Sequence, residues 1–271
     1  MSDGFATINN ARIYYEIAGT GQPFVMVHAA IADTCQWNNE FTYFAKHYRV
    51  IRYDMRGYGK SEPVEGEFSH LQDLTALLDY LHIDQPLILM GCSMGGGLVM
   101  NFALTYPSKV KALIMVDSGP MGLELDIEEP AKFKEVEKAY DAGNLDLVAE
   151  LETQIWFDGL GRTPSQVNPV MRKLAYEMNR NDLTLDAKQL GKQLPDVQVP
   201  AANRLNELHM PVLAIVGDQD KPFAVAAADY MVEKIPSARK AIIKDAGHLS
   251  NMDHPDEFQQ IVTTFLEGVA G

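Results

Sequence analysis

The sequence predicts an α/β protein with a mostly parallel wound sheet, and three observations support this fold class. Short apolar runs recur along the 271-residue chain, and runs that are apolar on both faces are typical of strands covered on both sides. Segments with helical spacing separate several runs, which implies right-handed strand-helix-strand crossovers. The composition, with 46% hydrophobic and 22% charged residues, excludes a disordered, collagen-like or coiled-coil chain.

The elements follow in order from these patterns. Apolar and polar positions alternate on both sides of Asn9-Asn10, which predicts a β-hairpin because asparagine tolerates the positive φ of a tight turn. Leucine spacing predicts helices over 71–81 and over 98–106, the second ending before Pro107. Six buried strands are expected at Phe24–Val27, Tyr48–Tyr53, Leu87–Met90, Ala112–Val116, Val212–Val216 and Ala241–Ile243.

The stretch between Gly119 and His209 contains no convincing strand and is interpreted as a helical cap inserted between the sixth and seventh strands. Three cap helices are expected, near Pro130–Ala142, Leu145–Phe157 and Gln166–Asn181. The predicted domains are a first part of the core at 1–119, the cap at 120–209, and a second part of the core at 210–271.

Charge and cysteine content restrict the partners and the compartment. The formal net charge is −14, and a field of that sign repels nucleic acid and anionic membrane surfaces. Cys35 and Cys92 lack the spacing of a disulfide framework or a redox motif, and neither a secretory signal nor a membrane-spanning run is visible. We therefore expect a cytoplasmic protein with a small-molecule substrate, and a homodimer is an open alternative to a monomer.

The most informative stretch combines a buried strand, the motif Gly-Cys-Ser-Met-Gly at 91–95 and the start of a helix. Glycines two residues either side of Ser93 remove Cβ atoms that would clash in a tight strand-to-helix turn. A phosphate loop or a plain helix cap is the alternative, but the strand before and the helix after favour a nucleophile elbow. Ser93 is therefore the predicted nucleophile.

A serine nucleophile needs a histidine base that is oriented by a carboxylate. In this strand order the acid follows one late strand and the histidine follows the next. The first of these strands ends in Gly-Asp-Gln-Asp, and the second leads to His248. Asp220 is favoured over Asp218 because it lies farther into the loop and has room to reach the histidine. Asp117, after an earlier strand, is the third candidate.

Acyl transfer also needs hydrogen-bond donors for the oxyanion. One donor is expected to be the backbone N–H of Met94, and the second is expected from the loop at 28–31. His28 is interpreted mainly as a structural hydrogen-bonding residue. The candidate pocket residues, several of them in the cap, are His28, Ile31, Met121, Trp156, Phe157, Met171 and Leu249.

Together these residues resemble the α/β-hydrolase superfamily over essentially the whole chain. The stretch 54–61, Asp-Met-Arg-Gly-Tyr-Gly-Lys-Ser, is similar to the superfamily's D-x-R-G-x-G-x-S loop. The resemblance implies a catalytic triad of Ser93, Asp220 and His248, with an oxyanion hole formed by the amides of Ala30 and Met94.

Two details refine the resemblance. The usual His-Gly of the oxyanion loop is His28-Ala29 in this chain. The stretch 32–34, Ala-Asp-Thr, with Trp37 and the sequence at 52–57, is partly similar to the 3-oxoadipate enol-lactonase branch.

The predicted function is a serine hydrolase that cleaves a small carboxylic ester or enol-lactone through an acyl-enzyme on Ser93. No H-E-x-x-H motif, Walker lysine or dinucleotide fingerprint occurs, so no metal and no cofactor are predicted. Two alternatives remain: a C–C bond hydrolase of a β-diketone-like substrate, and a small-ligand receptor that retains the pocket.

Overall fold

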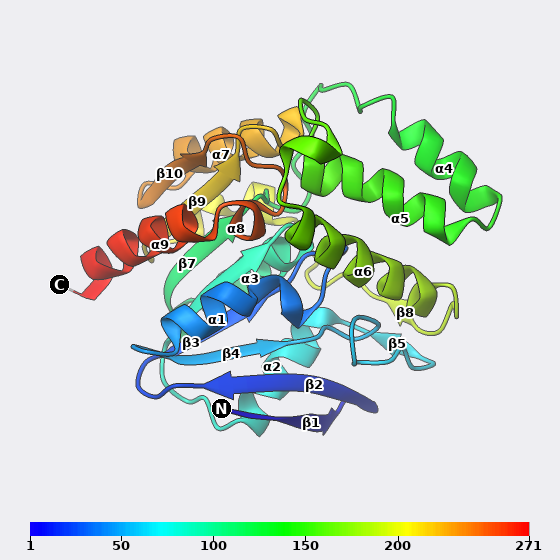
Figure 1. Cartoon of the computed structure of the whole chain (residues 1–271). Coiled ribbons are helices and arrows are strands. Elements are labelled where there is room, and N and C mark those ends of the chain that lie inside the picture. Colours follow the sequence, from blue (N-terminus) through cyan, green and yellow to red (C-terminus); the bar gives the residue numbers. More distant parts are fainter. Residues whose placement is uncertain (271) are drawn as a thin grey trace.

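Eight strands form one sheet in the computed structural model, which describes residues 1–270 (Figure 1). Their spatial order is β1-β2-β4-β3-β6-β7-β9-β10. Pairing is antiparallel for β1 with β2 and for β2 with β4, and parallel from β4 to β10. The strands are β1 (Ser2–Ile8), β2 (Ala11–Ala18), β3 (Pro23–Val27), β4 (Arg49–Tyr53), β6 (Leu87–Cys92), β7 (Val110–Val116), β9 (Val212–Gly217) and β10 (Ala238–Ile243).

The predicted fold class is confirmed, and each predicted apolar run lies within or overlaps a strand of this sheet. The hairpin turn has φ of 45° at Asn9 and 63° at Asn10, as a two-residue turn between antiparallel strands requires. A separate two-stranded parallel pair, β5 (Glu67–Phe68) with β8 (Lys192–Gln193), was not predicted because two residues carry no periodicity.

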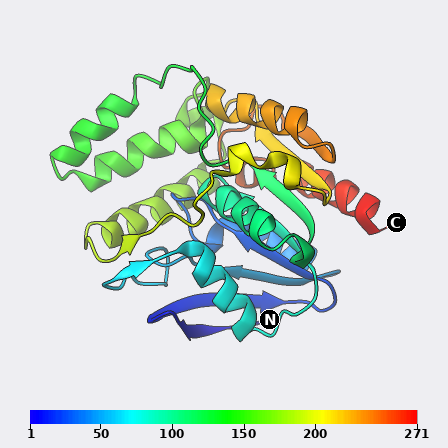
Figure 2. The ribbon, with the colours of Figure 1, turned by 180° about the vertical axis from the view of Figure 1, so that it is seen from behind.

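Helices cover both faces of the sheet. In Figure 1, α1 (Asn38–Phe44), α8 (Ser250–Asp253) and α9 (Pro255–Ala270) lie on the near face. Figure 2 shows the opposite face, covered by α2 (His70–Tyr80, cyan), α3 (Met94–Thr105, teal) and α7 (Pro222–Lys234, orange). Short helical turns are η1 (Thr34–Trp37), η2 (Pro107–Lys109), η4 (Pro164–Gln166), η5 (Ala201–Asn203) and η6 (Leu205–Glu207).

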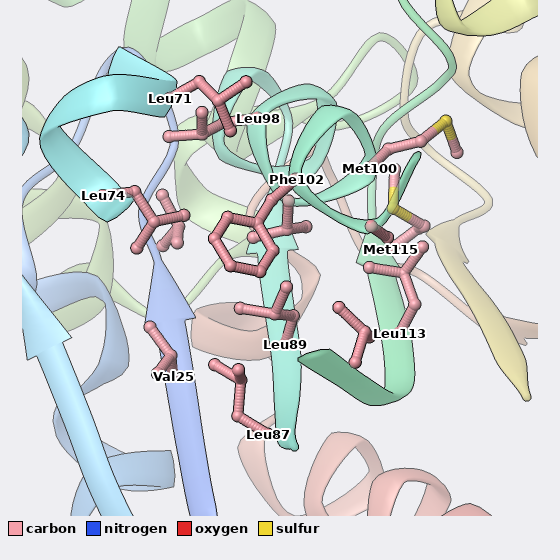
Figure 3. Packing of buried hydrophobic residues seen from close by; sticks show 14 of the residues in the cluster. Val25, Leu71, Leu74, Leu87, Leu89, Leu98, Met100, Phe102, Leu113 and Met115 are labelled. Carbon is pink, nitrogen blue, oxygen red and sulfur yellow. The ribbon is translucent and has the colours of Figure 1, made fainter. Parts of the chain in front are cut away.

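The core consists of one apolar layer on each face of the sheet, because successive side chains of a strand point to opposite faces. In β6, Leu89 belongs to the layer beneath α2 and α3, whereas its neighbour Ile88 belongs to the layer beneath α1 and α9. Figure 3 shows Phe102 of α3 between Leu74 of α2 and Leu89 of β6. Central strands buried on both faces explain why the apolar runs are continuous.

A helical segment lies between β7 and β9, the sixth and seventh strands of the main sheet in chain order. It contains α4 (Phe133–Asp141), α5 (Leu145–Thr153), the π-helical turn η3 (Gln154–Asp158) and α6 (Pro169–Asp186). The third predicted cap helix was placed too early: α6 begins after the Asn168 N-cap and continues to Asp186. The domain boundaries near 120 and 209 stay predictions.

Among residues 1–270, no helix is both long enough and apolar enough to cross a lipid bilayer.

Candidate active site

Ser93 lies at the sharp turn between β6 and α3. Its backbone has φ 52° and ψ −116°, a conformation that is strained for a residue with a side chain. The turn is held by its amide, which donates to the Val116 carbonyl at 2.9 Å, and by Ser118 Oγ, which donates to the Ser93 carbonyl at 2.7 Å. The side chain is half-buried at the carboxyl edge of the parallel strands.

The glycines around Ser93 allow backbone segments to approach closely. A Cβ on Gly91 would lie 2.2 Å from the Gly95 carbonyl oxygen, and a Cβ on Gly95 would lie 2.4 Å from the His28 carbonyl oxygen. Both neighbours are backbone atoms that cannot move aside like a flexible side chain. The glycines of the motif are therefore required because β6, α3 and the loop after β3 pack tightly against one another.

Asp220 and His248 meet at the ends of neighbouring strands β9 and β10. Asp220 Oδ2 lies 2.7 Å from His248 Nδ1, and Asp220 Oδ1 accepts a bond from the Lys221 amide at 2.6 Å. Asp218 is exposed and instead accepts a bond from the Asp245 amide at 2.8 Å. Of the two carboxylates on this loop, Asp220 is therefore the one in contact with the histidine.

His248 is held at the wall of a cavity. Its amide donates to the Trp156 carbonyl at 2.8 Å, and the Trp156 ring lies 4.6 Å from the imidazole, centroid to centroid. Its Nε2 is buried and has no hydrogen-bond partner within residues 1–270. Burial acts to lower the pKa of His248, but the Asp220 charge and hydrogen bond and the Asp117 charge outweigh it and raise that pKa.

Asp117, the third candidate for the acid, lines the same cavity as His248 but bonds to other groups. Its Oδ2 accepts bonds from the Ser250 hydroxyl at 2.6 Å and from the Ser250 amide at 3.1 Å, and its Oδ1 accepts from the Gly217 amide at 2.8 Å. Burial, followed by the neighbouring charge of Asp220, raises the pKa of Asp117 to about 7. Asp117 thus ties the end of β9 to the segment that follows His248.

The loop after β3 presents a backbone donor beside the helix that follows Ser93. The Ala29 amide is already bonded to Gln36 Oε1 at 2.9 Å, whereas Ala30 is exposed and its amide has no acceptor in the described part of the chain. Met94 is the first residue of α3, so its N–H has no partner within the helix. Ala30 and Met94 are therefore the residues with amides available to an oxyanion.

Two cavities adjoin these groups and share the Trp156 wall. The smaller, of about 210 Å³, is lined by Ser93, Met94, His248 and Met121 together with Lys221 and other residues. The larger, of about 470 Å³, is lined by Ala30 and Ile31 of the loop after β3 and extends beneath α6. The larger volume matches the scale of small-molecule sites, and the smaller one lies below it. Among residues 1–270, no group of three or more His, Cys, Asp or Glu side chains is arranged to hold a metal ion.

The family model for the alpha/beta hydrolase fold matches residues 22–255, which is most of the chain and includes Ser93, Asp220 and His248. The chain belongs to the alpha/beta hydrolase fold family. Hydrolysis is accordingly the general class of reaction that this membership supports.

Individual relatives of this alpha/beta hydrolase agree with that class. It is 27% identical to a 2-hydroxy-6-oxononadienedioate/2-hydroxy-6-oxononatrienedioate hydrolase of Comamonas testosteroni, covering 97% of this chain and 95% of the relative. It is 25% identical to a 2-hydroxy-6-oxo-6-(2'-aminophenyl)hexa-2,4-dienoic acid hydrolase of Metapseudomonas resinovorans, covering 97% and 90%. Its fold is similar to that of the enol-lactonase from Burkholderia xenovorans LB400, with a TM-score of 0.79, 21% identity, and coverage of 97% of this chain and 99% of that chain.

Four of the candidate pocket residues of this hydrolase lie in the packed interior or outside the two cavity walls. Phe157 and Leu249 are fully buried in the apolar layer beneath α1 and α9. Phe157 points inward because neighbouring residues of a helical turn point in different directions and Trp156 takes the cavity side. Met171 is half-buried and packs against the same layer. None of these three residues lines either of the two cavities, whereas Ile31, Met121 and Trp156 do.

His28 is the fourth candidate outside the two cavity walls, and its contacts are those of a structural histidine. Its Nε2 accepts a bond from the Met55 amide at 2.9 Å, so Nδ1 carries the proton and donates to the Ala29 carbonyl at 2.7 Å. Burial lowers the pKa of His28 to about 4, which keeps the ring neutral. Both nitrogens are therefore occupied by backbone groups and are not available to a substrate.

The polar side chains of the larger cavity were not among the residues predicted from the sequence. Arg56 and Tyr58 come from the 54–61 loop, which was interpreted as structural, and His70 begins α2. Asp182 lies in α6 among other polar residues, a pattern that is typical of an exposed helix face. Lys221, in the smaller cavity, directly follows Asp220 and was detectable only by that proximity.

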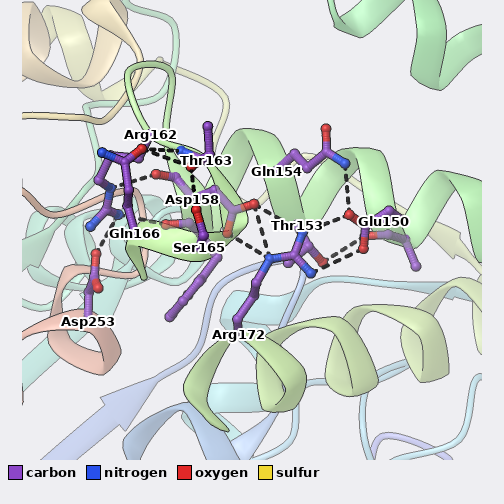
Figure 4. Close-up of polar contacts among 12 residues, drawn as sticks. Glu150, Thr153, Gln154, Asp158, Arg162, Thr163, Ser165, Gln166, Arg172 and Asp253 are labelled. Carbon is purple, nitrogen blue, oxygen red and sulfur yellow. Dashed lines mark hydrogen bonds and ion pairs between the residues drawn. The ribbon is translucent and has the colours of Figure 1, made fainter. Parts of the chain in front are cut away.

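Arg162 connects the segment between β7 and β9 to the histidine loop (Figure 4). Its guanidinium donates to Asp253 Oδ2 at 2.6 Å and to the Phe157 carbonyl at 2.9 Å. Asp253 Oδ2 also accepts from the Gly247 amide at 3.2 Å, next to His248. The turn that carries Trp156 and the loop that carries His248 are thus held together.

A second arginine, Arg172, holds the carboxyl end of the same turn and links it to α5 (Figure 4). Arg172 of α6 donates to both carboxylate oxygens of Asp158, at 2.9 and 3.1 Å from Nε, and to Glu150 of α5 at 2.7 Å. The guanidinium thus connects α6 to α5 and to the end of the π-helical turn that carries Trp156.

Proposed function

We propose that this chain is a cofactor-free serine hydrolase of small carboxylic esters or enol-lactones. The observation that carries the proposal is the 2.7 Å contact between Asp220 and His248, with the Nε2 of His248 unpartnered within residues 1–270 on a cavity that Ser93 also lines. An imidazole held by a carboxylate at one nitrogen and free at the other is the base that a serine nucleophile needs.

The proposed reaction proceeds in two steps. Ser93 Oγ attacks the substrate carbonyl carbon while His248 Nε2 accepts the hydroxyl proton, and the amides of Ala30 and Met94 donate to the oxyanion. The C–O bond breaks, and the leaving alcohol or enol takes the proton from His248. Water then attacks the acyl-enzyme with His248 as base, and the carboxylic acid leaves while Ser93 regains its proton.

The test is a panel of short p-nitrophenyl esters and enol-lactones, assayed with the native protein and with Ser93→Ala. Turnover that disappears in the variant, together with a mass increase of one acyl group on Ser93, supports the proposal. Turnover that persists in a folded Ser93→Ala protein overturns the nucleophile assignment. No turnover and no labelling across the panel favour the small-ligand receptor.

The acid is tested by two substitutions with the same change of charge. Asp220→Asn is expected to lower kcat by about 10³- to 10⁴-fold, because the imidazole loses the partner that fixes its tautomer. Asp218→Asn is the matched control at an exposed position of the same loop and should stay near the native rate. Equal losses in both variants would contradict the assignment of Asp220.

Cleavage of a C–C bond in a β-diketone-like substrate is the second candidate. It is favoured by the names of the relatives, which are hydrolases of 2-hydroxy-6-oxo acids. The experiment is a direct comparison of kcat/KM for a vinylogous diketone acid and for a short ester of similar size. A higher kcat/KM for the diketone acid would replace ester cleavage as the proposed reaction.

A further inference from the structure

The larger cavity has an acidic wall that the proposed reaction does not use. It lies between α6 and the loop after β4, and it reaches the loop that carries Ala30. Three carboxyl side chains line it, namely Glu152, Asp182 and Asp186. The cavity of about 470 Å³ has room for a substrate group beyond the reacting carbonyl.

Asp182 is the central acid of this wall. It is only 5% exposed, its Oδ1 accepts a bond from the Gly59 amide at 3.1 Å, and its Oδ2 has no partner within residues 1–270. Burial, followed by the charges of Asp33 and Asp54, raises the pKa of Asp182 to about 9. A buried polar atom without a partner costs free energy, so a ligand that satisfied it would bind more tightly.

The other two acids also keep acceptor atoms free. Glu152 accepts one bond, from Asn179 at 2.9 Å, through Oε2. Asp186 accepts one bond, from the Tyr140 hydroxyl at 3.2 Å, through Oδ2. Their remaining oxygens have no protein donor in the described part of the chain, so the wall offers several acceptors to a ligand.

The basic groups of the same wall do not offset these acids. Arg56 forms a two-point ion pair with Asp73, at 2.8 Å for both contacts, and its Nη2 also donates to the Asn9 carbonyl, so its charge is neutralised inside the wall. His70 is 4% exposed, and burial lowers its pKa to about 4, which leaves the ring neutral. Lys221 lines the smaller cavity, where it stands over the Trp156 ring.

We propose that the larger cavity binds a positively charged amine carried by the substrate at the end remote from the scissile ester or lactone. This inference rests on the proposed function. Glu152 and Asp186 supply acceptor oxygens, and Asp182, which its raised pKa leaves protonated at neutral pH, releases its proton to solvent when an ammonium group binds in its place. The rings of Tyr58, Phe68 and Trp156 line the same space and can stabilise a cation through their faces. A remote carboxylate meets like charges there, so this cavity is poorly suited to a dioate such as the one that the Comamonas testosteroni relative's name describes.

The experiment compares three p-nitrophenyl esters of matched length, with acyl chains ending in an amine (aminohexanoyl), a methyl group (heptanoyl) or a carboxylate (adipoyl). We expect kcat/KM to fall in that order, with the amine at least tenfold above the carboxylate. Glu152→Gln combined with Asp182→Asn should collapse the ratio of amine to methyl ester. Glu177→Gln, an exposed acid of α6 paired with Lys173 outside the cavity, is the control and should keep it.

A binding measurement separates this inference from the proposed function and does not depend on the double variant folding. Calorimetry on Ser93→Ala with hexylamine and with hexanoate reports on the cavity even if no ester is turned over. Tighter binding of hexylamine supports the inference. Equal or tighter binding of hexanoate, or a carboxylate ester that matches the amine ester in kcat/KM, overturns it.

Discussion

Gln36 and Asn251, 215 residues apart in the chain, form a buried bridge beneath the candidate active site. Gln36 Nε2 donates to Asn251 Oδ1 at 3.2 Å, and Asn251 Nδ2 donates back to the Gln36 carbonyl at 2.9 Å. Gln36 Oε1 accepts from the amide of Ala29, next to Ala30, and Asn251 lies three residues after His248. The proposed oxyanion loop and the histidine segment therefore share one polar support.

Replacing Gln36 with methionine is expected to lower kcat by about 10- to 100-fold, because a small displacement of the Ala30 amide weakens oxyanion stabilisation. The free energy of unfolding should also fall by about 1–3 kcal/mol, since the Ala29 amide loses its buried acceptor. The measurements are steady-state kinetics and denaturant unfolding.

Gln259→Met is the matched control for that variant. Gln259 contacts Glu40 on the far side of the same network, at 3.5 Å, and touches neither loop. The Gln259→Met variant should have a lower free energy of unfolding than the native protein but the same kcat. An unchanged kcat in Gln36→Met would mean that the bridge acts only on stability, and equal kcat losses in both variants would mean that the loss does not come from this bridge.

The activity should depend on pH through His248. The protonated imidazole cannot accept the Ser93 proton, so kcat/KM is low in acid and rises as His248 loses its proton. Because the net effect of its surroundings raises the pKa of His248, the midpoint should lie above the ordinary imidazole value of about 6.5. Repeating the profile with an ester of a better leaving group checks that it reports the chemical step. A flat profile from pH 5 to 9 would rule out His248 as the base.

The close packing of the nucleophile elbow can be tested by substituting two glycines that have different neighbours. Gly91→Ala places a Cβ 2.2 Å from a backbone oxygen and should lower the free energy of unfolding by about 1–3 kcal/mol or more. Gly97→Ala meets Met121 Cγ at 3.0 Å, a flexible neighbour, and gains helix propensity of about 1 kcal/mol, so it should be tolerated. Chemical denaturation of the two variants measures both effects, and the opposite ranking would contradict the observed turn.

Glu40 should make stability depend on pH. Its side chain is fully buried, and burial raises its pKa to about 7, while Asn251 and Gln259 donate to it. The folded protein then holds a proton that the unfolded chain releases near pH 4.5, so this residue's contribution to stability falls from about pH 4.5 to 7 and is constant above.

Glu40→Gln removes that ionisation. Its unfolding free energy relative to the native protein should increase between pH 5 and 8, by on the order of 1–3 kcal/mol. Glu177→Gln, an exposed change of the same kind, serves as the control. A difference that does not vary with pH would show that Glu40 keeps its charge state on unfolding.

Local patterns in the sequence were sufficient to predict the hairpin, the buried strands and the nucleophile elbow. Asn9-Asn10 and the glycines at 91–95 act through φ and through the absence of Cβ, which are properties of the residues themselves. The apolar runs required burial on both faces whatever they packed against. Element ends were less well predicted, since the start of α6 depends on a capping side chain, Asn168.

Which residues line the cavities could not be predicted from the sequence, because it depends on contacts between segments that are far apart in the chain. Trp156 and Phe157 are adjacent aromatic residues, yet one lines both cavities and the other is fully buried, because the π-helical turn and its arginine contacts set their directions. The role of Asp182 depends on Gly59 and on the charges that surround it from other elements.

The chain alone therefore specified the fold class, the strained serine turn and the order in which acid and histidine follow their strands. The tertiary structure decided that Asp220, and not Asp218, contacts His248. It also decided which polar groups surround the cavities. The physical reason is range: backbone strain and burial patterns act within a few residues, whereas hydrogen bonds, desolvation and charge act between groups that only the packed sheet and its helical insertion bring together.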